Sequence, residues 1–215
     1  MAWARGDPPT TEAEERFWRQ GLTVVAGLDE AGRGPWAGPV WAGAVALPQM
    51  QGVVGELQGV RDSKALTPRQ REELFGRIRA IALAVGAGSA SAEEIDTLGI
   101  VPATRLAMHR ALDALGVVPQ ALILDAIVLP VIPLLQDAFP RADAQSITVA
   151  AASIVAKVLR DRWMVEYAEA RFPGYGFAQH KGYGTRQHQE ALECLGVCAL
   201  HRRSFAPIAS RLGRV

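Results

Sequence analysis

The sequence predicts an α/β fold built on a mixed sheet. The sequence has four short apolar runs of strand length, one that begins at Thr23 and three at residues 40–47, 81–89 and 121–125. Helical segments lie between these runs. Such alternation favours parallel strands, and a strand-to-strand hairpin near Pro48 would make the sheet mixed. A chain of 215 residues that is 49% hydrophobic has enough apolar material for one domain with a sizeable core.

The helices are predicted from their start signals. Thr67 is a good N-cap residue, Pro68 suits the first helical position and Gln70 completes a capping box, which indicates a helix over residues 68–81. Ser91 and Glu94 repeat the capping-box pattern and start a short helix. Further helices are expected at residues 102–115, 147–171 and 185–195. The small residues at 150–153 would let the longest helix lie close against the sheet.

Charge and composition exclude several classes of protein. The 23 Lys and Arg residues nearly balance the 22 Asp and Glu residues, so nucleic-acid binding would have to come from a local basic patch. Two cysteines make no disulfide framework. Residues 1–21 read as a flexible tail, with a short helix over residues 14–19 as an option within it, and not as a signal peptide. With no apolar stretch long enough to span a bilayer, we expect a soluble, cytoplasmic protein.

Carboxylates stand where two of the predicted strands end. Asp29 and Glu30 follow the first strand, and Asp125 closes the run at 121–125. Acids are also common in turns, so each alone is weak evidence for a site. Together they would repel one another unless a cation intervenes, and Mg²⁺ or Mn²⁺ prefers such oxygen ligands. Adjacent side chains of a regular strand point to opposite faces, so we expect the strand to break between Asp29 and Glu30, next to flexible glycines.

Five blocks of sequence carry a resemblance to a known family. They are GLDEAGRGPWAGPV at residues 27–40, RDSK at 61–64, AAASIVAK with RDR at 150–162, YGFAQHKGYGT at 175–185 and HRRSF at 201–205. In this order they resemble bacterial ribonuclease HII over roughly residues 22–208. The combination is far more specific than any one block.

This resemblance implies a ribonuclease-H-like mixed five-stranded sheet flanked by helices. The catalytic domain would span residues 22–184, and a helical C-terminal extension would span residues 185–215. The implied activity is endonucleolytic hydrolysis of the RNA strand of RNA–DNA hybrids, including single ribonucleotides embedded in duplex DNA, as in ribonucleotide excision repair. The products would carry 5′-phosphate and 3′-hydroxyl ends. The implied partner is such a duplex, bound by a monomer with no obligate protein partner and no membrane.

The resemblance also implies the metal ligands. Four carboxylates would hold two Mn²⁺ or Mg²⁺ ions, namely Asp29, Glu30, Asp125 and Asp143. Asp137 is a competitor for the fourth place, but Asp143 has the better spacing to the helix that follows. Two metals can activate water and stabilise the leaving 3′-oxygen.

Substrate recognition is implied for a second set of residues. The backbone of Gly32, Arg33 and Gly34 would meet the ribose 2′-hydroxyl, which distinguishes RNA from DNA. Lys64 matches a lysine that contacts phosphate, and Tyr183 matches a tyrosine that stacks near the following deoxyribose.

Three other interpretations are weaker. The sister ribonuclease HIII typically has Glu as its fourth acid, which disfavours it here. A non-catalytic nucleic-acid-binding module would gain nothing from repelling acids beside phosphate. A zinc site made from His188, Cys194, Cys198 and His201 is disfavoured because the spacing fits no finger pattern.

Overall fold

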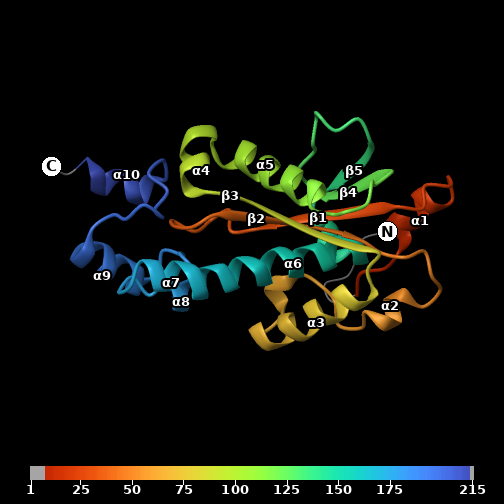
Figure 1. Cartoon of the computed structure of the whole chain (residues 1–215), viewed down its shortest axis with the longest axis horizontal. Coiled ribbons are helices and arrows are strands. Elements are labelled where there is room, and N and C mark those ends of the chain that lie inside the picture. Colours follow the sequence, from red (N-terminus) through yellow and green to blue (C-terminus); the bar gives the residue numbers. More distant parts are fainter. Residues whose placement is uncertain (1–7, 214–215) are drawn as a thin grey trace.

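A five-stranded mixed sheet forms the centre of the computed structural model, which describes residues 8–213 (Figure 1). The strand order is β3-β2-β1-β4-β5. β2 pairs antiparallel with both β3 and β1, whereas β1, β4 and β5 run parallel to one another. The predicted α/β class and mixed sheet are therefore confirmed. The strands are β1 (Val25–Ala31), β2 (Val40–Ala46), β3 (Ala84–Ala90), β4 (Ala121–Asp125) and β5 (Leu135–Phe139).

The antiparallel reversal does not lie where the sequence placed it. The turn between β1 and β2 spans residues 32–39, so the expected hairpin near Pro48 is wrong. After Pro48 the chain forms three helical elements before it returns antiparallel to β2. They are α2 (Val53–Glu56), η1 (Ser63–Ala65) and α3 (Pro68–Ile81).

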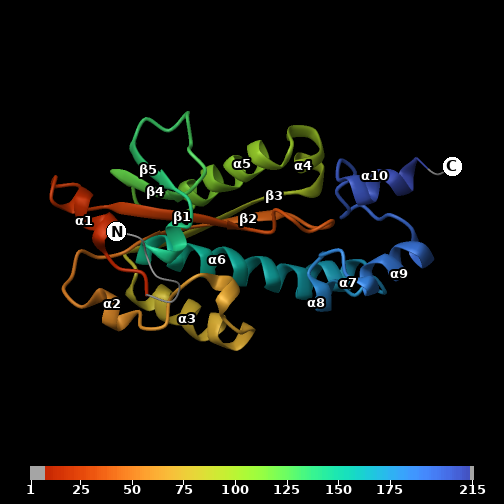
Figure 2. The ribbon, with the colours of Figure 1, turned by 180° about the vertical axis from the view of Figure 1, so that it is seen from behind.

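Helices cover both faces of the sheet (Figures 1 and 2). One face carries α4 (Ala92–Leu98) and α5 (Ile100–Asp113), and the other carries α3 and α6 (Ile147–Trp163). Both predicted capping boxes are present, at Thr67 with Gln70 and at Ser91 with Glu94. None of the helices in residues 8–213 combines the length and the apolar character that crossing a bilayer requires.

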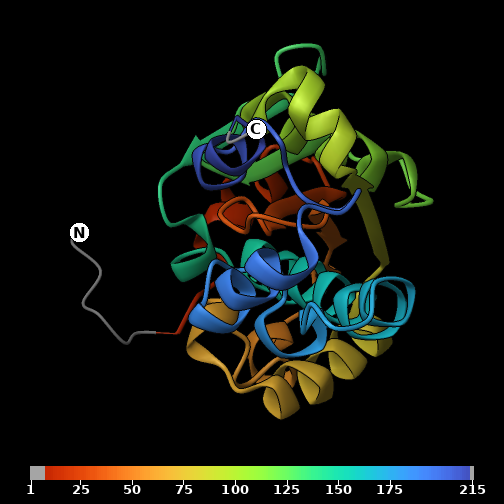
Figure 3. The same cartoon turned by 90° about the vertical axis from the view of Figure 1, so that its left-hand side faces the viewer.

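The C-terminal region continues from α6 and crosses the end of the sheet (Figure 3). A π-helical turn over Met164–Ala168 (η3) leads into α7 (Glu169–Arg171). The remaining helices are α8 (Phe177–His180), α9 (Arg186–Leu195) and α10 (Ala206–Leu212). Aromatic and aliphatic side chains from this region form a cluster of their own with Ala37.

The N-terminal segment corrects the expected tail. Residues 1–7 of that tail lie outside the described part, but α1 (Glu12–Trp18) packs Phe17 and Trp18 against the core. The buried carboxylate of Glu14 accepts hydrogen bonds from Ser146 Oγ at 2.6 Å and from the Thr148 amide at 3.0 Å. Residues 12–18 are therefore a structural helix that caps the start of α6.

Glycines in the central strands let the long helix lie close to the sheet. A Cβ at Gly43 would fall against the backbone carbonyl of Ala152, and a Cβ at Gly27 would fall against the backbone of Thr148. Both contacts are with α6, whose own N-terminal half is rich in alanine. Small residues on both surfaces therefore set the spacing between helix and sheet.

We expect Gly43→Ala to lower the free energy of unfolding by about 1–3 kcal/mol, because the added methyl group overpacks the interface. Gly76→Ala is the matched control, since Gly76 lies in the exposed middle of α3 with open space around it. The control should gain about 0.5–1 kcal/mol, because alanine favours helix. Urea unfolding of both variants measures the contrast, and a Gly43→Ala protein as stable as the wild type would contradict it.

Candidate active site

Asp29 and Asp125 lie side by side because of strand register. The parallel strands β1 and β4 pair Leu28 with Leu124, and each aspartate is the next residue along its strand. Because side chains alternate between faces, both carboxylates lie on the face opposite the two leucines. That is the face on which α6 packs, and Asp29 is only 4% exposed there. The predicted meeting of these two strand ends is present in the structure.

Asp143 reaches the same place from a short turn. It lies in η2 (Ala142–Ala144), and the amide of Ala142 donates a 3.1 Å hydrogen bond to Asp125 Oδ1. Asp125 therefore anchors the turn that carries Asp143. The competitor Asp137 instead lies within β5, where its carboxylate is 3.3 Å from Arg16 Nη1. The geometry favours Asp143 as the fourth acid.

Glu30 joins the site in a way that corrects the expected strand break. The ladder with β2 continues through Asp29 and Glu30 to Ala31, so β1 does not break between the two acids. Pairing with β4 ends at Leu28, however, and Glu30 therefore stands at an open edge of the sheet. Its Oε1 is 3.3 Å from Arg33 Nη1, and its Oε2 is buried without a hydrogen-bond partner in the described chain.

Burial and mutual repulsion perturb these acids. Desolvation raises the pKa of Asp29 well above its usual value, and the charges of Glu30 and Asp125 raise it further. Desolvation is also the largest cause for Asp143, whose pKa rises to about 6. The next cause at Asp143 is Asp62, a fifth carboxylate to which the sequence assigned no role. A cluster of buried carboxylates with raised pKa values is a candidate catalytic site.

The donor chemistry of this cluster suits a hard divalent cation. All the donors are carboxylate oxygens, one of them is buried and unpaired, and a cation would relieve the repulsion between them. Within residues 8–213, no three His, Cys, Asp or Glu side chains approach closely enough to enclose a metal ion. The fit therefore rests on charge and donor type.

A cleft of about 240 Å³ lies beside Glu30. It is lined by Glu30, Ala31, Gly32, Arg33, Gly34, Ser63, Lys64, Lys157 and Tyr183. All five residues predicted to bind substrate are in this set. Burial lowers the pKa of Lys64, but Asp62 and the site acids outweigh burial and raise it above its usual value. The cleft thus places ammonium groups next to the acidic cluster.

A larger groove of about 800 Å³ shares Lys157 and Tyr183 with this cleft. Its other basic residues include Arg71, Arg162 and Lys181. Tyr183 is 43% exposed, and Lys157 Nζ lies 5.9 Å from the centre of its ring. The cleft and the groove together therefore give an extended, partly basic surface with an aromatic ring between them.

Unusual backbone conformations cluster at the same site. Ala126, Arg141 and Lys181 have φ values of 59°, 58° and 52°, and no other non-glycine residue in the described chain has a positive φ. They lie next to Asp125, two residues before Asp143 and two residues before Tyr183. A left-handed conformation costs a non-glycine residue about 1–3 kcal/mol and is concentrated at functional sites. This clustering is independent support for the location of the site.

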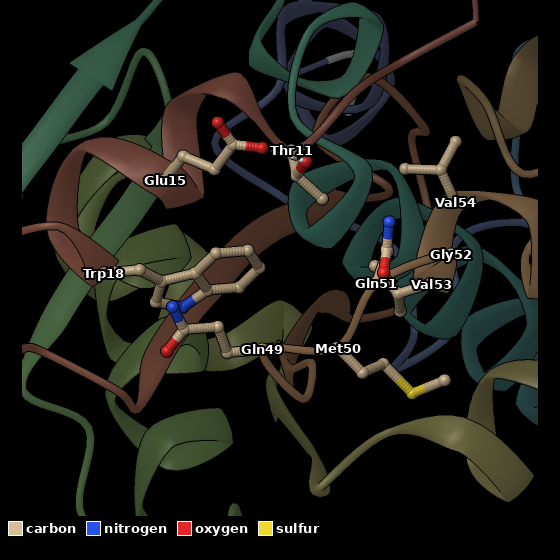
Figure 4. A pocket seen from close by; sticks show the side chains of 9 residues that line it. All are labelled: Thr11, Glu15, Trp18, Gln49, Met50, Gln51, Gly52, Val53 and Val54. Carbon is tan, nitrogen blue, oxygen red and sulfur yellow. Dashed lines mark hydrogen bonds between the residues drawn. The ribbon is translucent and has the colours of Figure 1, made fainter.

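A separate cavity of about 480 Å³ lies between α1 and the segment at residues 49–54 (Figure 4). Its carboxylate, Glu15, accepts a 2.8 Å hydrogen bond from the hydroxyl of Thr11. Trp18, Met50 and Val54 give much of the wall an apolar character. The cavity brings no group of acids together, so it is not the candidate active site.

The histidines near the C-terminus bond to one another. His188 Nδ1 donates to the carbonyl of Tyr183 at 3.0 Å, which leaves its Nε2 to accept from His201 Nε2 at 3.0 Å. His201 Nδ1 then accepts from the amide of Cys198 at 3.0 Å. Burial lowers the pKa of both histidines to about 4. The two histidines are therefore a neutral, hydrogen-bonded pair behind Tyr183. The geometry does not support a zinc site that includes Cys194, because Cys194 is exposed.

Comparison with known proteins gives a consistent result. Residues 26–208 match the family model for ribonuclease HII. A ribonuclease HII of Thermus thermophilus is 54% identical over 197 residues, covering 91% of this chain and 92% of the relative. The ribonuclease HII of Herpetosiphon aurantiacus is 50% identical over 198 residues, covering 92% of this chain and 95% of the relative.

Solved structures share the fold. Ribonuclease H2 from Pyrococcus horikoshii OT3 aligns with a TM-score of 0.72 and 30% identity, over 87% of this chain and 96% of that one. The ribonuclease HII of Archaeoglobus fulgidus, solved as a complex with PCNA, aligns with a TM-score of 0.69 and 28% identity, over 85% of this chain and 95% of that one. Bst-RNase HIII, solved with Mn²⁺, aligns with a TM-score of 0.69 over 99% of this chain and 75% of that one. It is only 18% identical and therefore shows likeness of fold alone.

We expect Asp143→Asn to stabilise the metal-free protein at pH 8 by about 1–2 kcal/mol, because it removes a buried charge that repels its neighbours. The raised pKa of about 6 sets the pH dependence. As the pH falls through 6 the wild-type carboxyl becomes neutral, so the advantage of the variant should shrink and vanish near pH 4. Urea unfolding in a chelator at several pH values measures this. Asp137→Asn, outside the cluster, should show no such gain, and a variant no more stable than the wild type at pH 8 would count against the repulsion.

Proposed function

Since this chain belongs to the ribonuclease HII family, and is therefore a ribonuclease H that cleaves RNA–DNA hybrids, we propose that it uses two divalent cations and also cleaves at single ribonucleotides within duplex DNA. The observation that carries this proposal is the meeting of Asp29, Asp125 and Asp143 beside a cleft lined by residues 32–34. The duplex is the partner that we propose, bound by a monomer in the cytoplasm.

We propose that Asp29, Glu30, Asp125 and Asp143 hold the cations, which are Mn²⁺ or Mg²⁺. When bound, such a pair of ions activates a water molecule and stabilises the leaving 3′-oxygen. The repulsion between the acids supports this assignment, because it is unfavourable unless cations are bound. The anchoring of the η2 turn by Asp125 also supports it, since a fixed turn holds Asp143 at a constant distance from β4.

The chain's own cations would position the substrate. Lys64 and Lys157 line the cleft and can contact phosphates on either side of the cleaved bond. Tyr183 offers an exposed ring that a sugar can stack against, and the hydrogen bond from His188 to its carbonyl holds its backbone in place. Cleavage with the 3′-oxygen as leaving group gives 5′-phosphate and 3′-hydroxyl ends.

Recognition of the ribose would fall to residues 32–34. A methyl group at Gly34 would meet open space in the free protein, which is where a sugar could approach the backbone. Gly32 differs, since it has a φ of 94° and a Cβ there would collide with the Arg160 side chain. Gly34 is therefore the position at which substrate fit can be tested without disturbing the fold.

We expect Asp125→Asn to lower the cleavage rate of an RNA–DNA hybrid about 100-fold or more, because it removes a charged metal ligand. Binding of the hybrid should persist, because the asparagine oxygen can still accept from Ala142 and hold the turn. Single-turnover kinetics in Mg²⁺ and Mn²⁺ measure cleavage, and fluorescence anisotropy measures binding. Asp137→Asn is the control and should cleave normally. If Asp125→Asn turns over at a normal rate, the alternative of a binding module without catalysis at these acids gains support.

We expect Gly34→Ala to reduce cleavage at a single ribonucleotide about 10-fold or more, because the added methyl group occupies space that the sugar needs. Arg33→Ala should instead weaken binding of all duplexes to a similar extent, because a guanidinium contacts the phosphates that RNA and DNA share. Both variants are measured on a hybrid and on a duplex with one ribonucleotide, with binding to all-DNA as the reference. A tolerated Gly34→Ala together with DNA cleavage by Arg33→Ala would place discrimination in the arginine side chain.

A further inference from the structure

A buried arginine from the C-terminal region holds the turn that carries Gly32, Arg33 and Gly34. The guanidinium of Arg202 donates to the carbonyls of Gly32 at 2.6 Å, Arg33 at 2.9 Å and Gly38 at 2.9 Å. Arg202 has no exposed surface, and its Cζ lies 5.1 Å from the centre of the Phe205 ring. Its fork is therefore fixed on one side by aromatic packing and on the other by three main-chain oxygens.

These bonds determine which side of the turn faces the cleft. In a trans peptide the N–H of one residue points opposite to the C=O of the residue before it. Since Arg202 draws the carbonyls of Gly32 and Arg33 inward, the amides of Arg33 and Gly34 point outward. Neither amide donates a hydrogen bond to another residue of the chain between positions 8 and 213, and both residues line the cleft. The turn thus presents two adjacent donors and keeps its acceptors inside.

The arrangement is costly, which argues against an incidental contact. Arg202 makes no ion pair with a carboxylate among the described residues, and a second fully buried arginine, Arg160, lies close to it. Arg160 donates to the carbonyls of Pro39, Ala37 and Lys181, so it ties the same turn to the Tyr183 loop. Burying two unpaired cations is unfavourable unless they are well hydrogen-bonded.

We propose that Arg202 is a positioning residue for ribonucleotide recognition. It orients the peptide planes between Gly32 and Gly34 so that the amides of Arg33 and Gly34 receive an acceptor oxygen of the substrate, and that oxygen is the ribose 2′-oxygen. A phosphate oxygen has the same acceptor chemistry, but it is present in RNA and DNA alike. This inference rests on the proposed cleavage at single ribonucleotides.

Arg202→Lys tests the proposal, because lysine keeps the charge but loses the planar fork that holds three carbonyls. Affinity is measured by anisotropy in a chelator for two duplexes of one sequence, one with a single ribonucleotide and one all-DNA. We expect Arg202→Lys to reduce the preference for the ribonucleotide duplex about 10-fold, the factor equivalent to about 1.4 kcal/mol. Affinity for the all-DNA duplex should not change.

Two control variants separate positioning from stability. Arg110→Lys changes an arginine that also donates to a main-chain carbonyl, that of Ser89 at 2.7 Å, but away from the cleft. Ile78→Val lowers stability through a buried α3 side chain. Both should keep the full preference. If they lose it as Arg202→Lys does, or if Arg202→Lys keeps it, the positioning role is overturned. Equal loss on both duplexes would mean that the amides receive phosphate, and would also overturn it.

The wild type provides the remaining distinction. If the wild-type protein shows neither a preference for the ribonucleotide duplex nor cleavage of it, the proposed function fails, whatever the variants do. If Arg202→Lys does not fold, the amide resonances of wild-type Arg33 and Gly34 decide the question by NMR. The ribonucleotide duplex should shift both resonances, whereas the all-DNA duplex should not. Equal shifts with both duplexes, or none, would refute the assignment.

Discussion

The parallel register of β1 and β4 is the constraint on which the site depends. Pairing Leu28 with Leu124 brings Asp29 and Asp125 to the same height and onto the same face. A slip by one residue would move one carboxylate to the opposite face and separate the pair. The register is fixed by burial on both sides, because Leu28 and Leu124 pack towards α5 while Val25 and Ile123 lie in the cluster with α1 and α6. The two helical layers therefore position the two acids.

Local signals predicted much of this fold. Thr67 with Gln70 and Ser91 with Glu94 began helices where expected, because a capping box needs only neighbours in sequence. The errors came where long-range contacts decide the outcome. Residues 1–21 look like a polar tail in which a helix is only an option, yet the helix forms and Glu14 is buried against Ser146 and Thr148. β5 has only five residues, two of them polar and none of them fully buried, and it pairs along its length with the parallel strand β4.

The candidate site divides in the same way. Acids at strand ends could be read from the sequence, and so could the glycines beside them. The continuous strand through Asp29 and Glu30 could not, because the open edge next to Glu30 exists only where β4 stops pairing. Asp62 and Arg202 lie in two of the blocks that carry the family resemblance, but their neighbours in sequence do not indicate what they contact. Arg202 acts on Gly32, 170 residues away in sequence, through a contact that only the folded chain creates.

Charge separation across the turn after β1 connects these features. Carboxylates gather at the ends of β1 and β4, while Arg160 and Arg202 lie buried behind residues 32–39, although the net charge of the chain is only +1. Burying the carboxylates together is unfavourable, and so is burying the two arginines, because the carboxylates form no ion pairs with Arg160 or Arg202. A bound duplex with its cations would offset both costs. The metal ions would neutralise the carboxylates, and the sugar–phosphate backbone would accept hydrogen bonds from the amides that the arginines orient. The free protein therefore gives up stability at the place where substrate binding can restore it, which is the pattern expected of a functional site.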